Sequence, residues 1–276
     1  IDNTKSFALG FHRLAINGYK NPQSDQPLKI NDCILICNGE IYNWKKLHTN
    51  LKIPMSTGSD CEIIIHLYKK YGIEHTLKLL DGVFAFCLYD CQKNEIYIAR
   101  DLYGIRPLFI GKLEHMYIFS SILKCYPDLN KFGNINVVQF PPGNYSKFIF
   151  ENKDEWNHIY TKKFSTSTLT INPNYDFKYT FDMIYNSLNN AVKKRIINTD
   201  RPIACLLSGG LDSSLITGLV KKNLPKNAKL HTWSIGFEGS EDLRYAQKVA
   251  DYLKTTHHSI VVKEEEFLKA IPDVIN

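Results

Sequence analysis

The chain has 276 residues, of which 44% are hydrophobic, and it carries a formal net charge of +6. This length suits about two domains with a core each, and no apolar run approaches the length of a membrane span. The modest charge and the unpatterned spacing of the seven cysteines argue against a nucleic-acid surface, a zinc site or a disulfide framework. We expect a cytoplasmic protein whose partners include neither nucleic acid nor membrane.

Three short strings in the first half carry polar residues that suit recognition of an amino acid. They are Phe11-His12-Arg13-Leu14-Ala15-Ile16, Cys37-Asn38-Gly39-Glu40-Ile41-Tyr42-Asn43 and Gly58-Ser59-Asp60-Cys61-Glu62. Each string also has a plainer interpretation. Phe7 to Ile16 is predicted as a strand with Arg13 as a surface charge, and Asn38-Gly39 as a turn after the strand Ile34 to Cys37. Ser59 and Glu62 have the spacing of a helix capping box, which would leave Asp60 at an exposed helix start.

Further strings follow: Asp81 to Phe86, Arg100 to Leu108 and Pro142-Gly143. Val83 to Tyr89 and Glu95 to Ala99 are predicted as two strands of a hairpin, because a polar turn separates them. The adjacent charges Arg100 and Asp101 are predicted to form a solvated ion pair.

Taken together and in this order, the strings resemble the glutamine pocket of class II glutamine amidotransferases. The resemblance implies that Arg13 pairs with the α-carboxylate of glutamine, and that Glu40 and Asp60 receive its α-ammonium. Asn38 and Gly39 would form the catalytic oxyanion hole. It also implies an α+β glutaminase domain over residues 1–150, with the αββα layers of N-terminal-nucleophile (Ntn) hydrolases. The expected glutamine-binding residues are Arg13, Leu14, Ala15, Ile16, Asn17, Asn38, Gly39, Glu40 and Asp60.

The nucleophile of this family is an N-terminal cysteine whose own α-amine serves as the base. The present chain begins with Ile1, and its first cysteine is Cys33. None of its cysteines offers an α-amine, and free cysteine mostly behaves as a small buried hydrophobe, so structural thiols are predicted. We expect the nucleophile to lie outside this sequence, and the chain to be a middle piece that is inactive as it stands.

Residues 151–178 are polar and lack clear periodicity, so they are predicted as a linker with an edge segment. The basic run at 193–195 is predicted to be the solvated face of a helix. From Pro202 the pattern predicts a buried strand to Leu207, a loop over 208–212 and a helix over 213–222. Glycines in such a loop let backbone N–H groups approach an anion, and the helix dipole adds attraction.

The loop sequence from Ser208 to Ser214 is Ser-Gly-Gly-Leu-Asp-Ser-Ser. It lacks the lysine of a Walker A loop and the spacing of a dinucleotide fingerprint. It resembles the pyrophosphate-binding loop of the ATP pyrophosphatases, which activate an oxygen as an adenylate and release pyrophosphate. The residues expected to bind ATP and pyrophosphate are Leu206, Ser208, Gly209, Gly210, Asp212, Ser213, Ser214 and Ile235.

Two of these assignments have alternatives. The resemblance places Leu206 and Ile235 beside the adenine, whereas their apolar strands alone favour core positions. Asp212 is the candidate metal ligand for Mg²⁺, since a hard cation prefers oxygen ligands, and a helix cap is the alternative role for this residue. His257 and His258 are predicted to start a strand rather than to bind a metal.

Strands and helices alternate after the loop, at 230–237, 243–253, 258–262 and 264–275. This alternation predicts an α/β domain over 179–276 with a doubly wound parallel sheet. A glutaminase region followed by a pyrophosphate loop is the arrangement of the asparagine synthetase family.

The resemblance implies that glutamine hydrolysis supplies ammonia to a β-aspartyl-AMP made from aspartate and Mg²⁺-bound ATP, which gives asparagine, AMP and pyrophosphate. A homo-oligomer is compatible with this activity. A β-lactam synthetase-like homologue that uses no glutamine, and a catalytically dead protein that binds ATP and glutamine, remain alternatives. A Met-Cys-Gly start upstream would favour asparagine synthesis over the former.

Overall fold

The computed structural model describes residues 7–114, 116–126, 133–151, 155–165 and 176–275. The chain divides into two compact units, residues 1–170 and 171–276. Residues 152–154 and 166–175 of the expected linker lie outside the described residues. None of the helices in the described segments combines the length and apolarity needed to cross a membrane.

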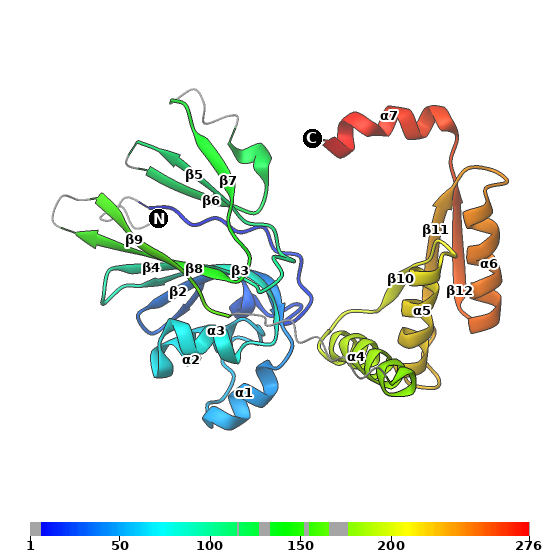
Figure 1. Cartoon of the computed structure of the whole chain (residues 1–276), viewed down its shortest axis with the longest axis horizontal. Coiled ribbons are helices and arrows are strands. Elements are labelled where there is room, and N and C mark those ends of the chain that lie inside the picture. The colour runs from blue at the N-terminus through cyan, green and yellow to red at the C-terminus, as the bar shows by residue number, and fades with distance from the viewer. Residues whose placement is uncertain (1–6, 115, 127–132, 152–154, 166–175, 276) are drawn as a thin grey trace. The chain divides into compact units, whose positions relative to one another are not determined.

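The first unit is built on a six-stranded antiparallel sheet in the order β1-β2-β3-β4-β8-β9 (Figure 1). The strands are β1 Leu28–Ile30, β2 Cys33–Ile41, β3 Gly82–Asp90, β4 Glu95–Arg100, β8 Asn144–Glu151 and β9 Glu155–Lys163. The predicted hairpin is confirmed as β3 and β4. The edge strand β9 falls in the range expected as a linker with an edge segment.

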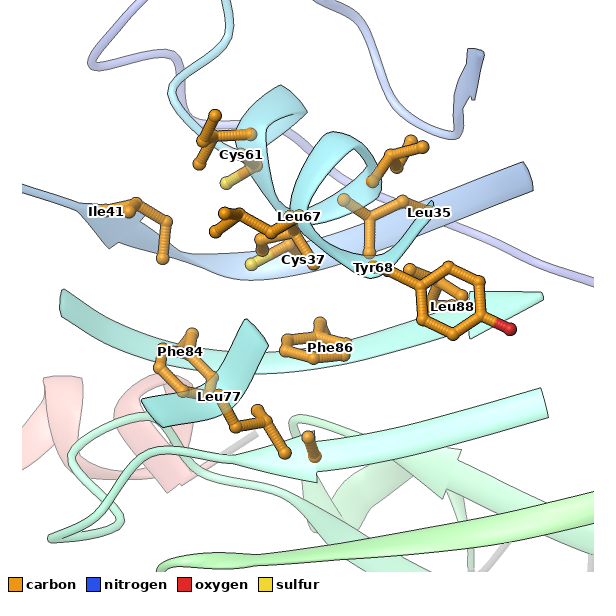
Figure 2. Close-up of a cluster of buried hydrophobic side chains, with 14 of the residues drawn as sticks. Leu35, Cys37, Ile41, Cys61, Leu67, Tyr68, Leu77, Phe84, Phe86 and Leu88 are labelled. Atoms are coloured by element: carbon orange, nitrogen blue, oxygen red, sulfur yellow. The ribbon is translucent and has the colours of Figure 1, made fainter. Parts of the chain in front are cut away.

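Three helices cover one face of this sheet, namely α1 Trp44–Leu51, α2 Glu62–Tyr71 and α3 Ile73–Leu79. Successive side chains of a strand point to opposite faces, so alternate residues of β2 and β3 meet these helices. Figure 2 shows Leu35 and Cys37 of β2 and Phe86 of β3 lying against Leu67 and Tyr68 of α2. All five side chains are buried. This core fixes the position of β2 relative to the start of α2.

A second, three-stranded sheet in the order β6-β5-β7 lies over the other face. Its strands are β5 Phe109–Leu113, β6 Met116–Ser120 and β7 Asn136–Gln139, and the short 3-10 turns η1 Pro22–Ser24 and η2 Leu123–Cys125 lie in loops. Cys87 and Ile98 of the large sheet pack with Leu108, Phe119 and Phe140. The described residues therefore form helix, sheet and sheet layers, in line with the expected glutaminase fold.

Two secondary-structure predictions near the start of the first unit are wrong. The stretch from Phe7 to Ile16 forms only an isolated bridge at Phe7 and otherwise has no regular structure. Asn38-Gly39 is not a turn, because β2 continues through it to Ile41 and pairs with β3 along its whole length. The long-range partner strand overrides the local turn preference of the dipeptide.

The predicted solvated ion pair at Arg100 and Asp101 is also wrong, because each residue is only 2% exposed. The Arg100 guanidinium donates at 2.7, 2.7 and 2.6 Å to three backbone oxygens, those of Gly104, Arg106 and Phe140. The Asp101 carboxylate accepts backbone N–H groups of four residues, Phe84, Tyr103, Ile105 and Arg106. Both charges are thus used to hold the loop after β4, which is what makes their burial tolerable.

The second unit contains a parallel sheet in the order β10-β11-β12, which confirms the predicted strand and helix alternation. Its elements are α4 Phe177–Ile197, β10 Ala204–Leu206, α5 Leu211–Asn223, β11 His231–Gly236, α6 Glu241–Leu253, β12 Thr256–Val261 and α7 Glu264–Ile275. Parallel strands joined by helices place the loop after β10 at the carboxyl edge of the sheet, where ligands of such sheets bind.

Within the described residues, helices cover one face of this sheet well and leave the other largely exposed. Cys205, Thr232 and Ser234 are buried on the face that α5 and α6 cover. Leu206 and Ile235 point to the opposite face and are 85% and 63% exposed, so the interpretation of them as core residues is wrong. His257 lies in β12, as predicted, where its ring nitrogens contact the hydroxyls of Thr232 at 2.9 Å and Ser234 at 3.1 Å.

Candidate active sites

The edge of β2 that faces away from β3 presents a row of backbone groups. β1 covers this edge as far as Leu35. Next, the Gln26 side chain binds both backbone groups of Cys37, its Oε1 accepting from N at 2.6 Å and its Nε2 donating to O at 3.0 Å. The Ile41 N–H donates to the Asp60 carboxylate at 2.7 Å. Alternate residues of an antiparallel strand direct N–H groups to the same side, so the Gly39 N–H faces this edge as well. This direction suits the oxyanion-hole role expected of Gly39.

Glycine is required at position 39 by the close approach of β3. A Cβ atom there would lie 2.3 Å from the Val83 carbonyl oxygen and 2.8 Å from the Phe84 Cα atom. Both are backbone atoms of a central strand, which cannot move aside as a flexible side chain would. The backbone of β3 therefore excludes any side chain at position 39, and only glycine can present its N–H here.

The Asn38 side chain points to the face of the sheet opposite the helices. Its Nδ2 donates to the Ser121 hydroxyl at 3.3 Å. Asn38 also lines a cavity of about 380 Å³ together with Phe11, His12 and Ser121. The amide is thus held by a neighbour and borders a hollow, as a donor to a reacting carbonyl must.

Asp60 and Glu40 are the two carboxylates expected to receive an ammonium group. Asp60 is 6% exposed, so the predicted exposed position is wrong. Burial raises the pKa of Asp60 to about 6, the N–H of Ile41 opposes this rise, and the nearby Glu40 adds to it. Glu40 is half-buried and accepts from Arg106 Nη2 at 3.4 Å. A bound cation would therefore relieve repulsion between two close carboxylates.

The expected capping box does not form at the start of α2. The helix begins at Glu62, its N-cap Cys61 makes no side-chain capping bond, and the Glu62 carboxylate turns back to the preceding loop. There it accepts the backbone N–H and the hydroxyl of both Ser56 and Thr57, at 2.6 to 3.2 Å. His66 adds a contact at 3.1 Å. This clasp holds the loop that leads to Asp60.

Glu62 is fully buried, and its environment determines its charge. Burial alone would raise the pKa of Glu62, but hydrogen bonds from His66, Thr57 and Ser56 outweigh it and hold the pKa well below its usual range. Glu62 is therefore ionised at neutral pH, although it has no solvent contact.

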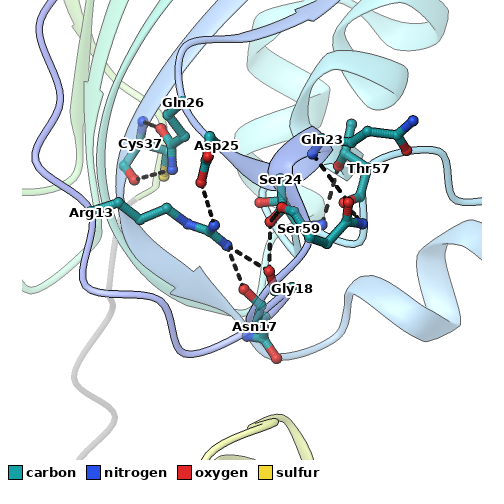
Figure 3. A network of polar contacts seen from close by, with 11 residues as sticks. Arg13, Asn17, Gly18, Gln23, Ser24, Asp25, Gln26, Cys37, Thr57 and Ser59 are labelled. Atoms are coloured by element: carbon teal, nitrogen blue, oxygen red, sulfur yellow. Dashed lines mark hydrogen bonds and ion pairs between the residues drawn. The ribbon is translucent and has the colours of Figure 1, made fainter.

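Arg13, the residue expected to bind the substrate carboxylate, lies in a polar network (Figure 3). Its Nη1 pairs with Asp25 Oδ1 at 2.8 Å. Its Nη2 donates to the backbone oxygens of Asn17 at 2.6 Å and Gly18 at 3.4 Å. The Asn17 side chain hydrogen-bonds Asp60, so Asn17 links the two ends of the expected pocket.

The other residues of the first string are less involved. The Leu14 side chain is 88% exposed, and Ala15 and Ile16 are half-buried. Asn17 is buried, in keeping with its contacts. The structure thus brings Arg13, Asn17, Asp60 and the edge of β2 together, whereas Leu14 points into solvent.

The described thiols behave as structural groups. Cys33, Cys37, Cys61, Cys87 and Cys205 are buried, Cys91 is half-buried and Cys125 is exposed. Burial raises the pKa of Cys33 to about 11 and that of Cys87 to about 12. Because the thiolate is the reactive form, these side chains are poor nucleophiles at neutral pH.

In the second unit, the loop between β10 and α5 is held by its own hydroxyls. Ser208 and Ser213 lie 3.0 Å apart between their Oγ atoms, and the Ser208 N–H donates to Ser213 Oγ at 3.3 Å. Gly210 precedes the first residue of α5. The first N–H groups of a helix have no acceptor within it, so this end of the 13-residue α5 attracts an anion.

Gly209 has the two properties that only glycine combines. Its φ is +82°, and a Cβ atom would lie 2.5 Å from the Ala246 N atom of α6. The Ser214 Oγ is buried and has no hydrogen-bond partner within the described residues. A buried hydroxyl without a partner at this loop fits a ligand oxygen.

The remaining ATP-site residues lie around the same loop. Asp212 lies in the first turn of α5. Asp212, Leu206 and Ser213 line a cavity of about 410 Å³, whereas Ile235 is exposed on β11. Among the described residues, no group of three or more His, Cys, Asp or Glu side chains could hold a metal ion. A lone carboxylate still suits Mg²⁺, which usually binds through one or two carboxylates and substrate phosphates.

Sequence reasoning missed four contacts of the expected glutamine pocket. They are made by Asp25, Gln26, Arg106 and Ser121. Arg106 belongs to a string that the resemblance already included, so its charge could have been considered as a partner for Glu40. Nothing in the sequence indicated the other three, because each reaches its partner across a fold that local patterns do not describe.

Comparison with known proteins assigns both units. Residues 1–164 match the glutamine amidotransferase domain family, and residues 183–276 match the asparagine synthase family. The glutamine-hydrolyzing asparagine synthetases of Mus musculus and Homo sapiens are 36% and 37% identical, each over 97% of this chain and 51% of the relative. Asparagine synthetase 2 of Oryza sativa subsp. japonica is 39% identical over 97% of this chain and 44% of its own.

The chain spans about half the length of the curated relatives it matches. Among solved structures, a glutamine phosphoribosylpyrophosphate amidotransferase from B. subtilis aligns with a TM-score of 0.46 at 15% identity, covering 87% of this chain and 74% of that chain.

Proposed function

Because the chain belongs to the glutamine amidotransferase domain family and continues into a region of the asparagine synthase family, we propose that it is part of a glutamine-hydrolysing asparagine synthetase. The observation that carries the proposal is the edge of β2. There the Gly39 N–H faces outward between Cys37, whose backbone Gln26 occupies, and Ile41, whose N–H binds the buried Asp60. In this proposal residues 1–150 are the glutaminase domain, 151–178 the linker, whose edge strand β9 extends the sheet of the first unit, and 179–276 the synthetase domain.

In the first domain, Arg13 binds the α-carboxylate of glutamine, since a guanidinium suits a carboxylate. Asp60 and Glu40 bind the α-ammonium. The Asn38 amide and the Gly39 N–H then stabilise the negative oxygen that forms when the side-chain amide is attacked. Leu14, Ala15, Ile16 and Asn17 complete the pocket. We assign the attack to an N-terminal cysteine and not to the cysteines of this chain.

In the second domain, ATP binds at the loop after β10. Gly209 and Gly210 bring backbone N–H groups to the phosphates, and Ser208, Ser213 and Ser214 add hydroxyls. Leu206 and Ile235 flank the adenine. Asp212 would hold Mg²⁺, which supplies neutralisation of polyphosphate charge when bound.

The reaction in the second domain forms and breaks two bonds. A β-carboxylate oxygen of aspartate attacks the α-phosphorus of ATP, and pyrophosphate is the leaving group. The start of α5 holds the released pyrophosphate. Ammonia from glutamine then attacks the β-carbonyl carbon of β-aspartyl-AMP, and AMP leaves. The products are asparagine, AMP and pyrophosphate.

The test measures all products with the complete gene product. We expect asparagine, AMP and pyrophosphate to form in equal amounts from aspartate, ATP and either glutamine or ammonia. Asp60→Asn should abolish the glutamine-dependent reaction and leave the ammonia-dependent one intact. Formation of ADP, or synthesis that glutamine does not support, would contradict the proposal.

A further inference from the structure

The side chain of Arg13 is already bound to a carboxylate of its own chain. Asp25 Oδ1 lies 2.8 Å from Arg13 Nη1, while Nη2 is turned to the backbone oxygens of Asn17 and Gly18. A guanidinium binds a carboxylate best through two parallel N–H donors. With Nη1 on Asp25 and Nη2 on the backbone, a second carboxylate that approaches both terminal nitrogens of Arg13 must compete with Asp25 for Nη1.

Asp25 is placed so that its side chain can leave without disturbing its backbone. The side chain is 68% exposed, whereas that of Arg13 is 18% exposed. The Asp25 N–H donates to the Pro22 oxygen at 3.1 Å, and the following residue, Gln26, is fastened to Cys37. Figure 3 shows this arrangement, with Asp25 pointing toward Arg13 and Gln26 pointing toward Cys37. A rotation of the Asp25 side chain alone would open Arg13.

The opposite end of the pocket has a similar internal partner. Glu40 contacts the Arg106 guanidinium at 3.4 Å. Two of the three charges expected to bind an amino-acid zwitterion, Arg13 and Glu40, are therefore each matched by the chain itself, by a carboxylate and a cation respectively. Of the two pairs, the one at Arg13 has the more exposed carboxylate and the shorter distance.

We propose that Asp25 occupies on Arg13 the position that the substrate α-carboxylate takes, so that glutamine binds by exchanging one carboxylate for another. This inference rests on the proposed function. Asp25 then acts as a built-in competitor that lowers the affinity for glutamine and screens Arg13 from ligands without a carboxylate. An exposed ion pair is weak, so we expect the competition to reduce the affinity about two- to fivefold.

The experiment compares glutamine binding to the full chain with and without the carboxylate of Asp25. Isothermal titration calorimetry measures the Kd of L-glutamine for the wild type, Asp25→Ala and the control Asp32→Ala. Asp32 is also a partly exposed aspartate paired with a basic side chain, Lys69, at 3.3 Å, but it lies away from Arg13. The second probe is 4-aminobutanamide, which is glutamine without its α-carboxylate and therefore has no group to displace Asp25.

We expect Asp25→Ala to lower the Kd of glutamine about two- to fivefold, while Asp32→Ala leaves it unchanged. The Kd of 4-aminobutanamide should be the same for the wild type and Asp25→Ala. A higher Kd for glutamine in Asp25→Ala would mean that Asp25 orients Arg13 for binding, and an unchanged Kd would mean that it does not compete, and either result overturns the inference. If neither the wild type nor the variant binds glutamine, the proposed glutaminase function itself fails, and the inference fails with it.

Discussion

Asp60 combines burial with the negative charge that its proposed role requires, and the two oppose each other. The carboxyl group is 6% exposed, yet an ammonium group binds only to its ionised form. Its pKa of about 6 in the fold lies above that of an exposed aspartate, because burial disfavours the charge. The native state therefore holds a proton between about pH 4 and pH 6 that the unfolded chain releases.

This difference predicts a pH-dependent gain in stability for Asp60→Asn. The native state binds more protons across that range, so the free energy of unfolding of the wild type falls as the pH rises through it. A folded pKa of about 6 corresponds to a loss on the order of 3 kcal/mol at pH 7. We expect Asp60→Asn to be more stable by up to about this amount in urea denaturation at pH 7. Near pH 4 the two proteins should be equally stable, and equal stability at both pH values would contradict the prediction.

Gly39 is limited by backbone contacts, which gives a second prediction at this scale. In Gly39→Ala the added Cβ would meet Val83 O at 2.3 Å, so β2 and β3 must separate or tilt. We expect a loss of about 2–3 kcal/mol in the free energy of unfolding, as for other overpacked sites. The control is Gly10→Ala, since a Cβ there meets no atom within 4 Å. Chemical denaturation of both variants measures the difference, and similar stabilities would refute this account.

At the scale of elements, the start of α2 depends on a buried charge. Glu62 replaces the expected helix cap by a clasp on Ser56 and Thr57, which closes the loop that carries Asp60. The clasp fixes the loop that leads to Asp60, the residue proposed to bind the ammonium group. It also explains why an ionised group is tolerated in a site without water contact.

We predict that Glu62→Gln destabilises the first unit by about 2–4 kcal/mol at pH 7, because four charge-assisted donors lose their carboxylate. The pKa of Glu62 is lowered by folding, so its stabilisation is present above the pKa of the unfolded chain and is lost as the pH falls below it. As the pH is lowered from about 5, through the range where an unfolded glutamate titrates, the free energy of unfolding should therefore fall less for the variant than for the wild type. Thermal unfolding at several pH values checks this.

The control for Glu62→Gln is another glutamate of the same unit, Glu74. It forms an exposed ion pair with Lys78 at 2.7 Å. Such pairs contribute little, so Glu74→Gln should change the stability by less than about 0.5 kcal/mol. If both variants lose the same amount, the clasp has no special role.

The loop after β10 gives a prediction that separates two adjacent glycines. Gly209→Ala places a Cβ 2.5 Å from Ala246 N on a residue with φ of +82°, so both the loop and α6 must shift. At Gly210 a Cβ would have only an ordinary contact, 3.5 Å to Ser208 Oγ. We expect hydrogen exchange in α6 to accelerate in Gly209→Ala and to stay unchanged in Gly210→Ala. Equal exchange rates would show that α6 does not depend on this close approach.

At the scale of the whole molecule, the chain consists of two compact units, each with its own core. A ligand stabilises only the unit that binds it, by about 2.7 kcal/mol at a hundredfold excess over its Kd. We therefore predict that glutamine slows hydrogen exchange in residues 7–165 and that ATP slows it in residues 176–275. Asp60→Asn should remove the effect of glutamine and keep that of ATP. Equal protection of both units by either ligand would contradict the assignment of the two pockets.

Some features could be predicted from the sequence because they depend on neighbours along the chain. The hairpin of β3 and β4 follows from two apolar runs and a polar turn, and the parallel sheet follows from the alternation of strands and helices. The string from Ser208 to Ser214 suggested its loop because glycine and hydroxyl residues act through the local backbone. Predictions from such local patterns hold where no distant segment of the chain changes the local conformation.

Other features could not be predicted, because distant segments decided them. Asn38-Gly39 became strand when β3 paired along it, and Arg100 became buried with its guanidinium bound to the carbonyl of Phe140, 40 residues away. Leu206 and Ile235 have apolar side chains, yet they are exposed because burial depends on which face of the sheet the helices cover.

By itself, the sequence determined the order of the elements, the two regions and the residue types available for chemistry, since these follow from local pattern and resemblance. Only the tertiary structure decided the protonation states of those residues and which partners in the chain they bind. It buried Asp60, clasped Glu62 and set Asp25 on Arg13. Solvent exclusion and through-space partners control pKa and ion pairing, and neither is a property of residues adjacent in the chain.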